Sequence, residues 1–270
     1  MKEDYIEFIK RHFEDWQNNG FCSSALALNS KLGCEYFSET NPHFFTGDLE
    51  AEFVMVHLNP KQIKDKKINK FKRFSALESG KEIGGFGSFD VYLNYYAKFG
   101  SLKYGENASR KHKSPFDHKQ IRFIRPFNVL PINSADNYKN LENVIDKKLQ
   151  IELIPFGSES FDYRKVGSEN LIQFIEPVLS FIFSSNRKYV VFCGRVFEGL
   201  LNKYIVKKNR ITFKLKKNDG QETLSDFEII NFQISINGVI FNGAIAPQYA
   251  KQGYPVEDYG KKVSSLYGKF

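Results

Sequence analysis

The sequence predicts an α/β fold: a three-layer α/β/α sandwich around a central, mainly parallel sheet of four to five strands. Short apolar segments that read as buried strands alternate with segments of helical periodicity. Four of the strands end in polar, Gly- or Pro-containing loops, which in such sheets gather at the carboxyl edge where ligands bind. We expect residues 1–270 to form a single domain, with 1–50 as a helical N-terminal extension packed on it.

The first half of the chain supplies two expected helices and one strand. In 3–18, apolar residues recur at three- and four-residue intervals before Gly20, which predicts a helix. The apolar run 51–60 ends in an Asn-Pro pair and reads as a buried strand. Residues 84–100 begin as a Gly-rich loop and continue as a helix with Ser88 as its N-cap.

The second half repeats the alternation. The expected elements are a helix at 140–149, a strand at 150–158, a helix at 169–184, and a strand at 188–194 followed by a helix. Residues 227–245 predict a β-hairpin, because the pair Asn237-Gly238 favours a type I′ turn.

The charge balance favours a polyanionic partner. The chain carries 39 Lys and Arg against 31 Asp and Glu, a formal net charge of +8. Basic residues concentrate at 61–73, 103–125 and 203–217, which would neutralise phosphates; ordinary solvated loops are the alternative. Aromatic residues make up 16% of the chain, enough to fill a core and also to stack on bases.

Other features bound the compartment and the chemistry. The three cysteines have no metal-ligand spacing, which predicts free thiols in a reducing compartment. The acidic N-terminus does not resemble a signal peptide, and no apolar run has membrane-spanning length. We therefore expect a cytoplasmic monomer without a membrane partner. Walker, GxGxxG, HExxH and CxxC motifs do not occur in the sequence, so no metal or cofactor is expected.

Four segments together resemble the uracil-DNA glycosylase superfamily, most closely its mismatch-specific branch. They are VMVHLNPK (54–61), IELIPFGS (151–158), YVVFCGRVFEGLL (189–201) and GAIAPQYAKQG (243–253). The first is similar to a strand that ends in a Gly-x-Asn-Pro-like loop, and the last lies where the family carries a His-Pro-Ser-like loop. The segments occur in the expected order along the chain.

The resemblance implies an enzyme that flips a base out of DNA and hydrolyses its N-glycosidic bond without a metal. Such a site must hold the base, donate hydrogen bonds to it as it leaves, and place a water beyond the sugar. Asn59 corresponds to the residue that would position this water. The alternative is that Asn59 and Pro60 form only a strand-ending turn.

Glu152 is an unusual feature of the second segment. A carboxylate inside an apolar strand is costly to bury without a partner. As an acceptor of hydrogen bonds, it would read an amino-bearing base such as a cytosine derivative. An exposed edge or an ion pair with Arg122 or Arg125 is the alternative. Phe156 and Phe89 are the candidates for stacking on the extruded base.

The chain departs from the family pattern at two positions. His57 stands where Gly is common; it would donate a hydrogen bond to a phosphate or a base, and the alternative is that it only caps the loop. In the last segment, Ala246-Pro247-Gln248 stands where the family usually presents the His that stabilises the leaving base, and it supplies no cation. We expect His57 and Gln248 to act as catalytic residues, with Gln248 donating a neutral hydrogen bond. Ser158 would hold a phosphate, and Gln248 with Tyr249 would form the loop that penetrates DNA. The expected DNA-binding residues are Pro60, Lys61, Ser158, Pro247, Tyr249 and Lys251.

Two other functions stay open at this point. One is a catalytically silent protein on the same fold that binds double- or single-stranded nucleic acid, in defence against foreign DNA. The other discards the resemblance and leaves an α/β hydrolase or transferase for a small phosphorylated compound.

Overall fold

The computed structural model describes residues 2–60, 86–106, 114–132, 137–158, 167–184, 187–216, 220–249 and 254–270. The chain divides into two compact units. Unit 1 comprises Met1–Phe45, Leu58–Tyr96 and Glu152–Ser184, and unit 2 comprises Thr46–His57, Ala97–Ile151 and Ser185–Phe270. Each unit is described by itself, and the expected single domain stays a prediction. Within these described ranges, no helix has both the length and the apolar character needed to span a membrane.

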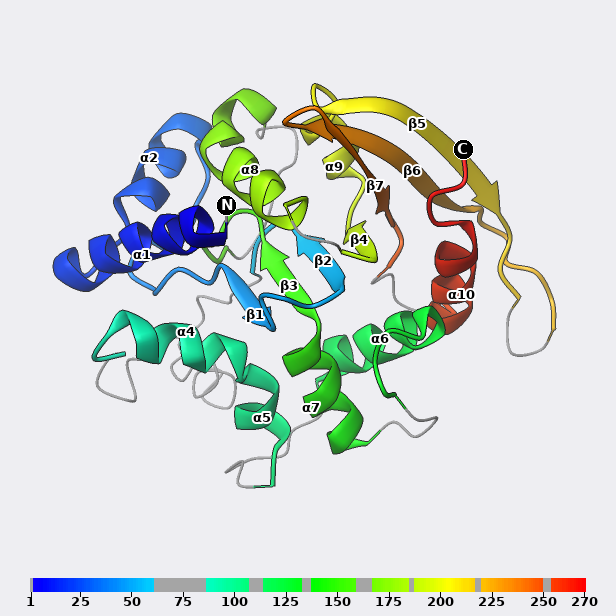
Figure 1. The fold of residues 1–270 in the computed structure, drawn as a ribbon, viewed down its shortest axis with the longest axis horizontal. Coiled ribbons are helices and arrows are strands. Elements are labelled where there is room, and N and C mark those ends of the chain that lie inside the picture. The colour runs from blue at the N-terminus through cyan, green and yellow to red at the C-terminus, as the bar shows by residue number, and fades with distance from the viewer. Residues whose placement is uncertain are drawn as a thin grey trace. The chain divides into compact units, whose positions relative to one another are not determined.

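The α/β class is confirmed, but the expected sheet of four to five mainly parallel strands is wrong. In the part of the chain that the structure describes, seven strands form one mixed sheet in the order β1-β3-β2-β4-β7-β6-β5 (Figure 1). Their bounds are β1 Phe45–Gly47, β2 Phe53–His57, β3 Leu149–Glu152, β4 Tyr189–Phe192, β5 Ile205–Phe213, β6 Phe227–Ile236 and β7 Val239–Ile245. β4 is parallel to both β2 and β7, whereas β6 is antiparallel to β7 and β5. The antiparallel β5 and β6 therefore enlarge the sheet and make it mixed.

The strand β5 lies within the basic stretch 203–217 and was not expected. It pairs with β6 from Ile205 to Phe213, and each of its residues is exposed or partly exposed. Cationic side chains are common on a strand at the end of a sheet, where they discourage pairing with other chains. The strand was not predicted from the sequence, because Lys207 and Lys208 are adjacent and the strand contains no buried apolar run.

The predicted hairpin of β6 and β7 is confirmed. Asn237 and Gly238 both have positive φ, 51° and 78°, which is the type I′ geometry. This turn fixes the register in which Ile236 faces Val239 and Ile230 faces Ile245. The hairpin thereby brings the start of β6 beside the end of β7.

Unit 2 covers both faces of β6 and β7 with helices. Its helices are α5 Phe99–Tyr104, α6 Pro115–Ile124, the 3-10 helix η2 Arg125–Phe127, α7 Tyr138–Lys147, α9 Val196–Leu200 and α10 Val256–Leu266. On one face, Phe197 of α9 packs on Phe192, which packs on Phe232. On the other face, the amide of Asn231 donates to the main chain at the end of α10.

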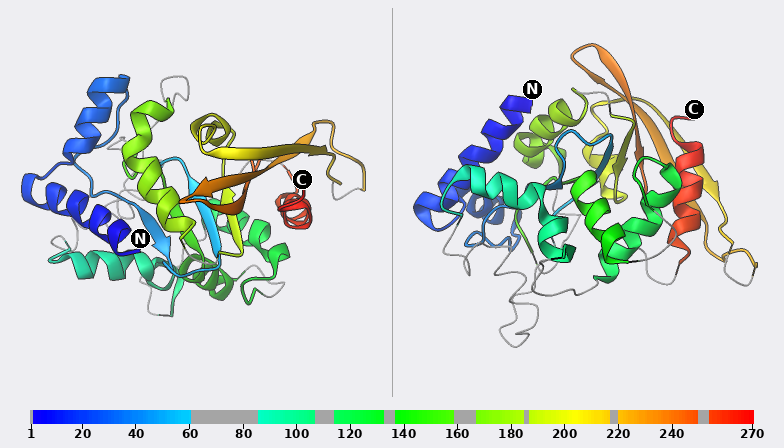
Figure 2. Two further views of the ribbon diagram at one scale, coloured as in Figure 1. Left: turned by 45° about the horizontal axis from the view of Figure 1, so that its top comes forward. Right: turned by 60° about the horizontal axis from the view of Figure 1, so that its bottom comes forward.

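Two of these helices, α6 and α10, were not expected and lie side by side (Figure 2). Ser114 caps α6 by accepting the Asp117 N–H, and Pro115 occupies the first turn. Gly260 permits the close packing of α10, because a Cβ atom there would lie 2.3 Å from the Phe123 carbonyl oxygen. The fixed α10 in turn positions Tyr259, which supports the site described below.

Unit 1 is built from helices around an aromatic core. Its helices are α1 Lys2–Asn19, α2 Ser23–Leu32, α4 Phe89–Ala97 and α8 Ser168–Ile182. The last residue of α4, Ala97, belongs to unit 2. The predicted helices at 3–18, after Ser88 and at 169–184 are confirmed, and the Val91 N–H donates to the Ser88 hydroxyl as expected of an N-cap. Tyr5 of α1 stacks on Phe181 of α8 with ring centroids 4.3 Å apart. Aromatic residues thus fill this core, as their abundance suggested.

Candidate functional site

The carboxyl ends of β2, β4 and β7 meet at one edge of unit 2. Because the three strands are parallel neighbours, their hydrogen bonds continue past the strand ends. The Cys193 N–H donates to Val56 and the Ala246 N–H donates to Phe192, over 2.8 and 2.9 Å. The residues that follow, His57, Arg195 and Gln248, consequently emerge at the same edge.

Three rings at this edge form what we call the His57 cluster: His57, Phe116 and Tyr249. The imidazole of His57 stacks on Tyr249 with ring centroids 5.7 Å apart and meets Phe116 edge-on at 5.6 Å. His57 and Tyr249 are buried, whereas Phe116 at the start of α6 is exposed. Phe123 backs Tyr249 at 5.0 Å. The cluster offers an imidazole and an exposed aromatic ring, a combination suited to holding a planar base.

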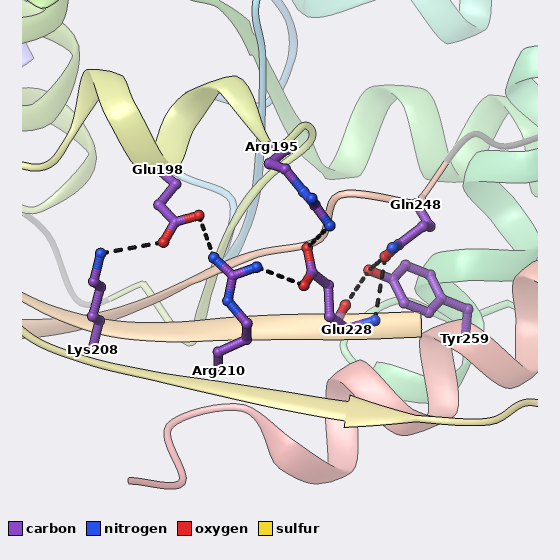
Figure 3. A network of polar contacts seen from close by, with 7 residues as sticks. All are labelled: Arg195, Glu198, Lys208, Arg210, Glu228, Gln248 and Tyr259. Carbon is purple, nitrogen blue, oxygen red and sulfur yellow. Dashed lines mark hydrogen bonds and ion pairs between the residues drawn. The ribbon is translucent and has the colours of Figure 1, made fainter. Parts of the chain in front are cut away.

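Charged residues beside β4 form what we call the Glu228 network: Arg195, Glu198, Lys208, Arg210 and Glu228. The Glu228 carboxylate lies between two guanidinium groups (Figure 3): Arg195 Nη2 donates to it over 2.5 Å and Arg210 Nη1 over 2.9 Å. Glu198 accepts from Arg210 Nη2 over 2.6 Å and from Lys208 over 3.2 Å. Cations and carboxylates therefore alternate along the network.

The register of β5 and β6 explains this arrangement. Lys208 and Arg210 are two residues apart on β5, so their side chains share one face of the sheet. Arg210 faces Ile230 and Glu228 is two residues from Ile230, which puts the carboxylate on that same face. Glu198 comes to it from α9.

Main-chain and side-chain groups hold Gln248 beside the network. Its side-chain oxygen lies 3.4 Å from both the Glu228 nitrogen and the Tyr259 hydroxyl (Figure 3). The Tyr259 hydroxyl has one proton and donates it to the Glu228 main-chain oxygen over 2.8 Å. Within the described residues, none of the hydrogen bonds of Gln248 uses its Nε2 group. That group remains available to donate to a ligand.

The pKa directions agree with these contacts. Burial raises the pKa of Tyr259, so its hydroxyl stays protonated and acts as a donor. Burial tends to raise the pKa of Glu198, but hydrogen bonds from Lys208 and Arg210 outweigh it and lower that pKa overall. The hydrogen bond to Glu198 also raises the pKa of Arg210. Both shifts favour the charged forms of the pair Glu198 and Arg210.

The predicted residues of unit 1 form a second polar locus, which we call the Asn59 turn: Asn59, Pro60, Phe156 and Ser158. Asn59 Nδ2 donates to the Ser158 hydroxyl over 2.8 Å, to the Pro60 carbonyl over 3.2 Å and to the Phe156 carbonyl over 3.5 Å. The Ser158 N–H closes the turn on Pro60. The Nδ2 group is thus fully used within the turn, and the Oδ1 acceptor is the end of the amide left for a water.

The other predicted base-binding residues lie in the packed part of unit 1. Glu152 is buried at the end of β3, and its N–H donates to the Phe44 carbonyl over 2.9 Å. Phe156 is buried and meets Phe174 edge-on at 5.9 Å. Phe89 packs against Phe13 at 5.6 Å. Their assignment to base reading and stacking stays a prediction.

The structure thus sorts the predicted site residues into two groups. His57, Pro247, Gln248 and Tyr249 belong to unit 2, whereas Asn59, Pro60, Phe89, Glu152, Phe156 and Ser158 belong to unit 1. Lys61 and Lys251 lie outside the described residues, as does the basic run 61–73. The three cysteines are free thiols. Among the side chains that the structure describes, no three His, Cys, Asp or Glu residues are grouped so as to hold a metal ion.

Comparisons with protein families, with curated proteins and with solved structures give no match to this chain. The site must therefore be interpreted from its own chemistry. Sequence reasoning missed Glu228, Arg210 and Tyr259, although Glu228 carries the same kind of signal as Glu152: one carboxylate in an otherwise apolar strand. Arg195 lies within the third segment of the resemblance, 189–201, and no role was predicted for it.

Proposed function

We propose that this chain is a DNA glycosylase-like enzyme that flips and excises a damaged or modified base by metal-free hydrolysis of the N-glycosidic bond. One observation carries the proposal. The strands from the four segments that resemble uracil-DNA glycosylases are consecutive neighbours in the sheet, in the order β3-β2-β4-β7. Segments that are distant in the sequence are thus neighbours in the sheet, and this neighbourhood supports the proposal. The three-layer α/β/α arrangement belongs to the same proposal.

The strand-end edge of unit 2 supplies groups suited to a departing base. A base that leaves as an anion is stabilised by preorganised hydrogen-bond donors. The imidazole of His57 is fixed between Tyr249 and Phe116, and the Nε2 group of Gln248 is oriented through its anchored oxygen. We assign His57 and Gln248 to this role. Because Tyr249 is buried against His57, we assign it to holding the imidazole rather than to penetrating DNA.

Asn59 keeps the role of orienting the attacking water. Its amide nitrogen is held by three acceptors of the Asn59 turn, so its Oδ1 has a defined direction. An oxygen fixed in this way can accept a hydrogen bond from water, although it cannot take up a proton as a carboxylate would. The contribution of Asn59 is therefore positioning, and its loss should lower the rate rather than change the pH profile.

The test is release of a base from oligonucleotides. Single- and double-stranded substrates containing uracil, a thymine mismatch or a modified cytosine are incubated with the protein, and abasic sites are detected by alkaline cleavage. We expect His57→Ala and Gln248→Ala each to slow release by about 10²–10³-fold. His118→Ala, on the same α6 helix as Phe116, is the matched control and should retain the wild-type rate. Absence of release from every substrate would contradict the proposal.

Base preference provides a second test, directed at Glu152. Reading an exocyclic amino group requires the carboxylate as acceptor, so Glu152→Gln should shift excision away from modified cytosines. The ratio of rates on modified cytosine and uracil is the measurement. An unchanged ratio in Glu152→Gln means that Glu152 does not read the base.

One observation favours the silent binding protein as a second candidate. In the described part of the loop after β7, residues 246–249, no side chain is a cation, and the Gln248 oxygen contacts the Glu228 main chain and Tyr259. A site without a charged donor would retain binding and lose the stabilisation of the leaving base. Tight binding of the same oligonucleotides, with no abasic sites in any of them, would identify this candidate.

A further inference from the structure

Arg195 displays a guanidinium group that is both exposed and fixed in place. Its side chain is 63% exposed, yet its Nη2 atom is held at 2.5 Å from a Glu228 carboxylate that is only 6% exposed. Glu228 is in turn fixed through its main chain, which contacts Tyr259 and Gln248. An exposed arginine anchored from below has lost most of its side-chain freedom before any ligand arrives. Its remaining N–H groups make no hydrogen bond to the described residues and can receive an anion.

The same distribution of exposure holds across the whole Glu228 network. Arg210 and Lys208 are 42% and 45% exposed, whereas the carboxylate of Glu198, which holds both, is 21% exposed. Each cation of the network is thus more exposed than the carboxylate that holds it. Three cations against two carboxylates leave a local charge of +1. A ligand that approaches from solvent meets the cations first.

We propose that Arg195, Arg210 and Lys208 form a binding surface for the phosphodiester backbone of a nucleic acid. Planar guanidinium groups suit phosphate oxygens, and a row of fixed cations suits a chain of phosphates rather than a single ion. This inference deepens the proposed function, because it assigns the backbone contact of the strand-end edge. Its test measures binding alone and does not depend on excision.

The competing explanation is that these cations only protect an edge. β5 is the last strand of the sheet formed by the described residues, and lysines on such strands discourage pairing with other chains. Under that explanation, Lys207 and Lys208 should be equivalent for nucleic-acid binding. They are adjacent on β5 but project from opposite faces, with Lys207 lying 4.9 Å from the Phe270 ring rather than in the network. This pair is a matched comparison of equal charge.

The first experiment is a binding titration by fluorescence anisotropy at several salt concentrations, with a single-stranded and a duplex oligonucleotide. We expect Arg195→Ala to weaken binding about tenfold or more and to lower the salt slope by about 0.7–0.9, the share of one phosphate contact. Lys208→Ala should also lower the salt slope. Lys207→Ala should leave the slope unchanged. Equal effects of Lys207→Ala and Lys208→Ala would overturn the proposal.

The second experiment changes the carboxylates, because general charge attraction and positioned cations predict opposite changes in binding affinity. Glu228→Gln and Glu198→Gln each raise the net charge by one, so general attraction to a polyanion predicts tighter binding. A surface that depends on positioned cations predicts weaker binding, by a factor of several, because the cations lose their anchors. Because Glu198 is less buried than Glu228, we expect Glu198→Gln to fold like wild type, so its binding can be compared directly with that of wild type. Tighter binding by Glu198→Gln would overturn the proposal.

The outcomes also separate this inference from the proposed function. If wild type excises a base and Arg195→Ala binds and excises like wild type, the phosphate surface is wrong and the glycosylase stands. If binding follows the expected pattern and no substrate yields abasic sites, the surface stands and the glycosylase is wrong.

Discussion

The Asn59 turn of unit 1 and the Glu228 network of unit 2 fix polar side chains at strand ends in two different ways. In the Asn59 turn, a neutral amide is held by a hydroxyl and two carbonyl groups. In the Glu228 network, a buried carboxylate holds two exposed arginines. The first uses no charge, whereas the second depends on ionisation.

Because one locus is neutral and the other is ionic, the two are suited to different roles. Neutral hydrogen bonds respond little to salt or pH and fix one acceptor, as a water-positioning residue requires. An ionic network presents cations to solvent and responds to both, as a surface for a polyanion requires. If these roles are correct, the contacts of the Asn59 turn should respond little to salt and pH, whereas those of the Glu228 network should respond to both.

The largest effect is expected when the ionic device loses both arginines. In the double variant Arg195→Ala, Arg210→Ala, the Glu228 carboxylate stays buried without its two guanidinium partners, which should cost about 3–5 kcal/mol of unfolding free energy. Urea denaturation measures it. Adding Glu228→Gln to the double variant should recover a large part of the loss, because no buried charge remains. A double variant as stable as wild type would show that Glu228 is not held by these arginines.

A smaller effect is expected from placing a charge in the neutral device. Asn59→Asp removes the donor that meets the Pro60 and Phe156 carbonyl groups and puts a carboxylate against them. The unfolding free energy should fall by about 1–3 kcal/mol at neutral pH. Desolvation and the carbonyl oxygens would raise the pKa of the new carboxyl, so the loss should shrink as the pH falls toward the ordinary Asp value of about 3.9.

Asn59→Ala is the control for that variant. It removes the same donor without adding a charge, so its deficit should be smaller and independent of pH. If Asn59→Asp and Asn59→Ala show the same deficit at every pH, the Asn59 amide does not face the two carbonyl groups.

These two devices also show where sequence reasoning succeeds. The local elements were accessible: the Asn237-Gly238 turn, the Ser88 cap and the helix that begins at Ser168 follow from short-range steric and hydrogen-bond rules. The Asn59 turn was partly accessible as well, because an Asn-Pro pair after an apolar run marks a strand end.

The Glu228 network was not accessible for a physical reason. Arg195 and Arg210 are 33 and 18 residues from Glu228 in the sequence. At such separations the sequence does not specify which of the many cations pairs with a buried carboxylate. The pairing depends on the register of β5, a strand concealed by its own basic composition. The number of strands was underestimated partly for the same reason, since β5 adds a further antiparallel strand beside the predicted hairpin of β6 and β7.

A further contrast concerns His12, which lies among aromatic rings of unit 1. Burial lowers the pKa of His12, while its hydrogen bond with the Phe8 carbonyl opposes that effect. The unfolded chain therefore binds the proton more readily, and stability should fall as the pH drops below the ordinary His value of about 6.5. The slope cannot exceed about 1.4 kcal/mol per pH unit for one proton.

His12→Phe should remove this contribution, because a phenyl ring can pack among Phe8, Phe44 and Phe174 without titrating. Thermal unfolding of both proteins between pH 5 and pH 8, a range of about 3 units around the His value, provides the measurement. A slope that survives in His12→Phe belongs to another group.

The smallest effect is expected from Glu198→Gln. This carboxylate is more accessible than Glu228, so its pairs with Lys208 and Arg210 should contribute no more than about 1 kcal/mol. Its lowered pKa makes that contribution present above the ordinary Glu value of about 4.3 and lost as the pH falls through the lower folded value.

At about 1 M salt the screening length falls to about 3 Å, and the difference in unfolding free energy between Glu198→Gln and wild type should disappear. The deficit of Asn59→Ala, which involves no charge, should persist at the same salt concentration. If both deficits respond equally to salt, the contrast between an ionic and a neutral device fails, and with it the reason for assigning polyanion binding to unit 2.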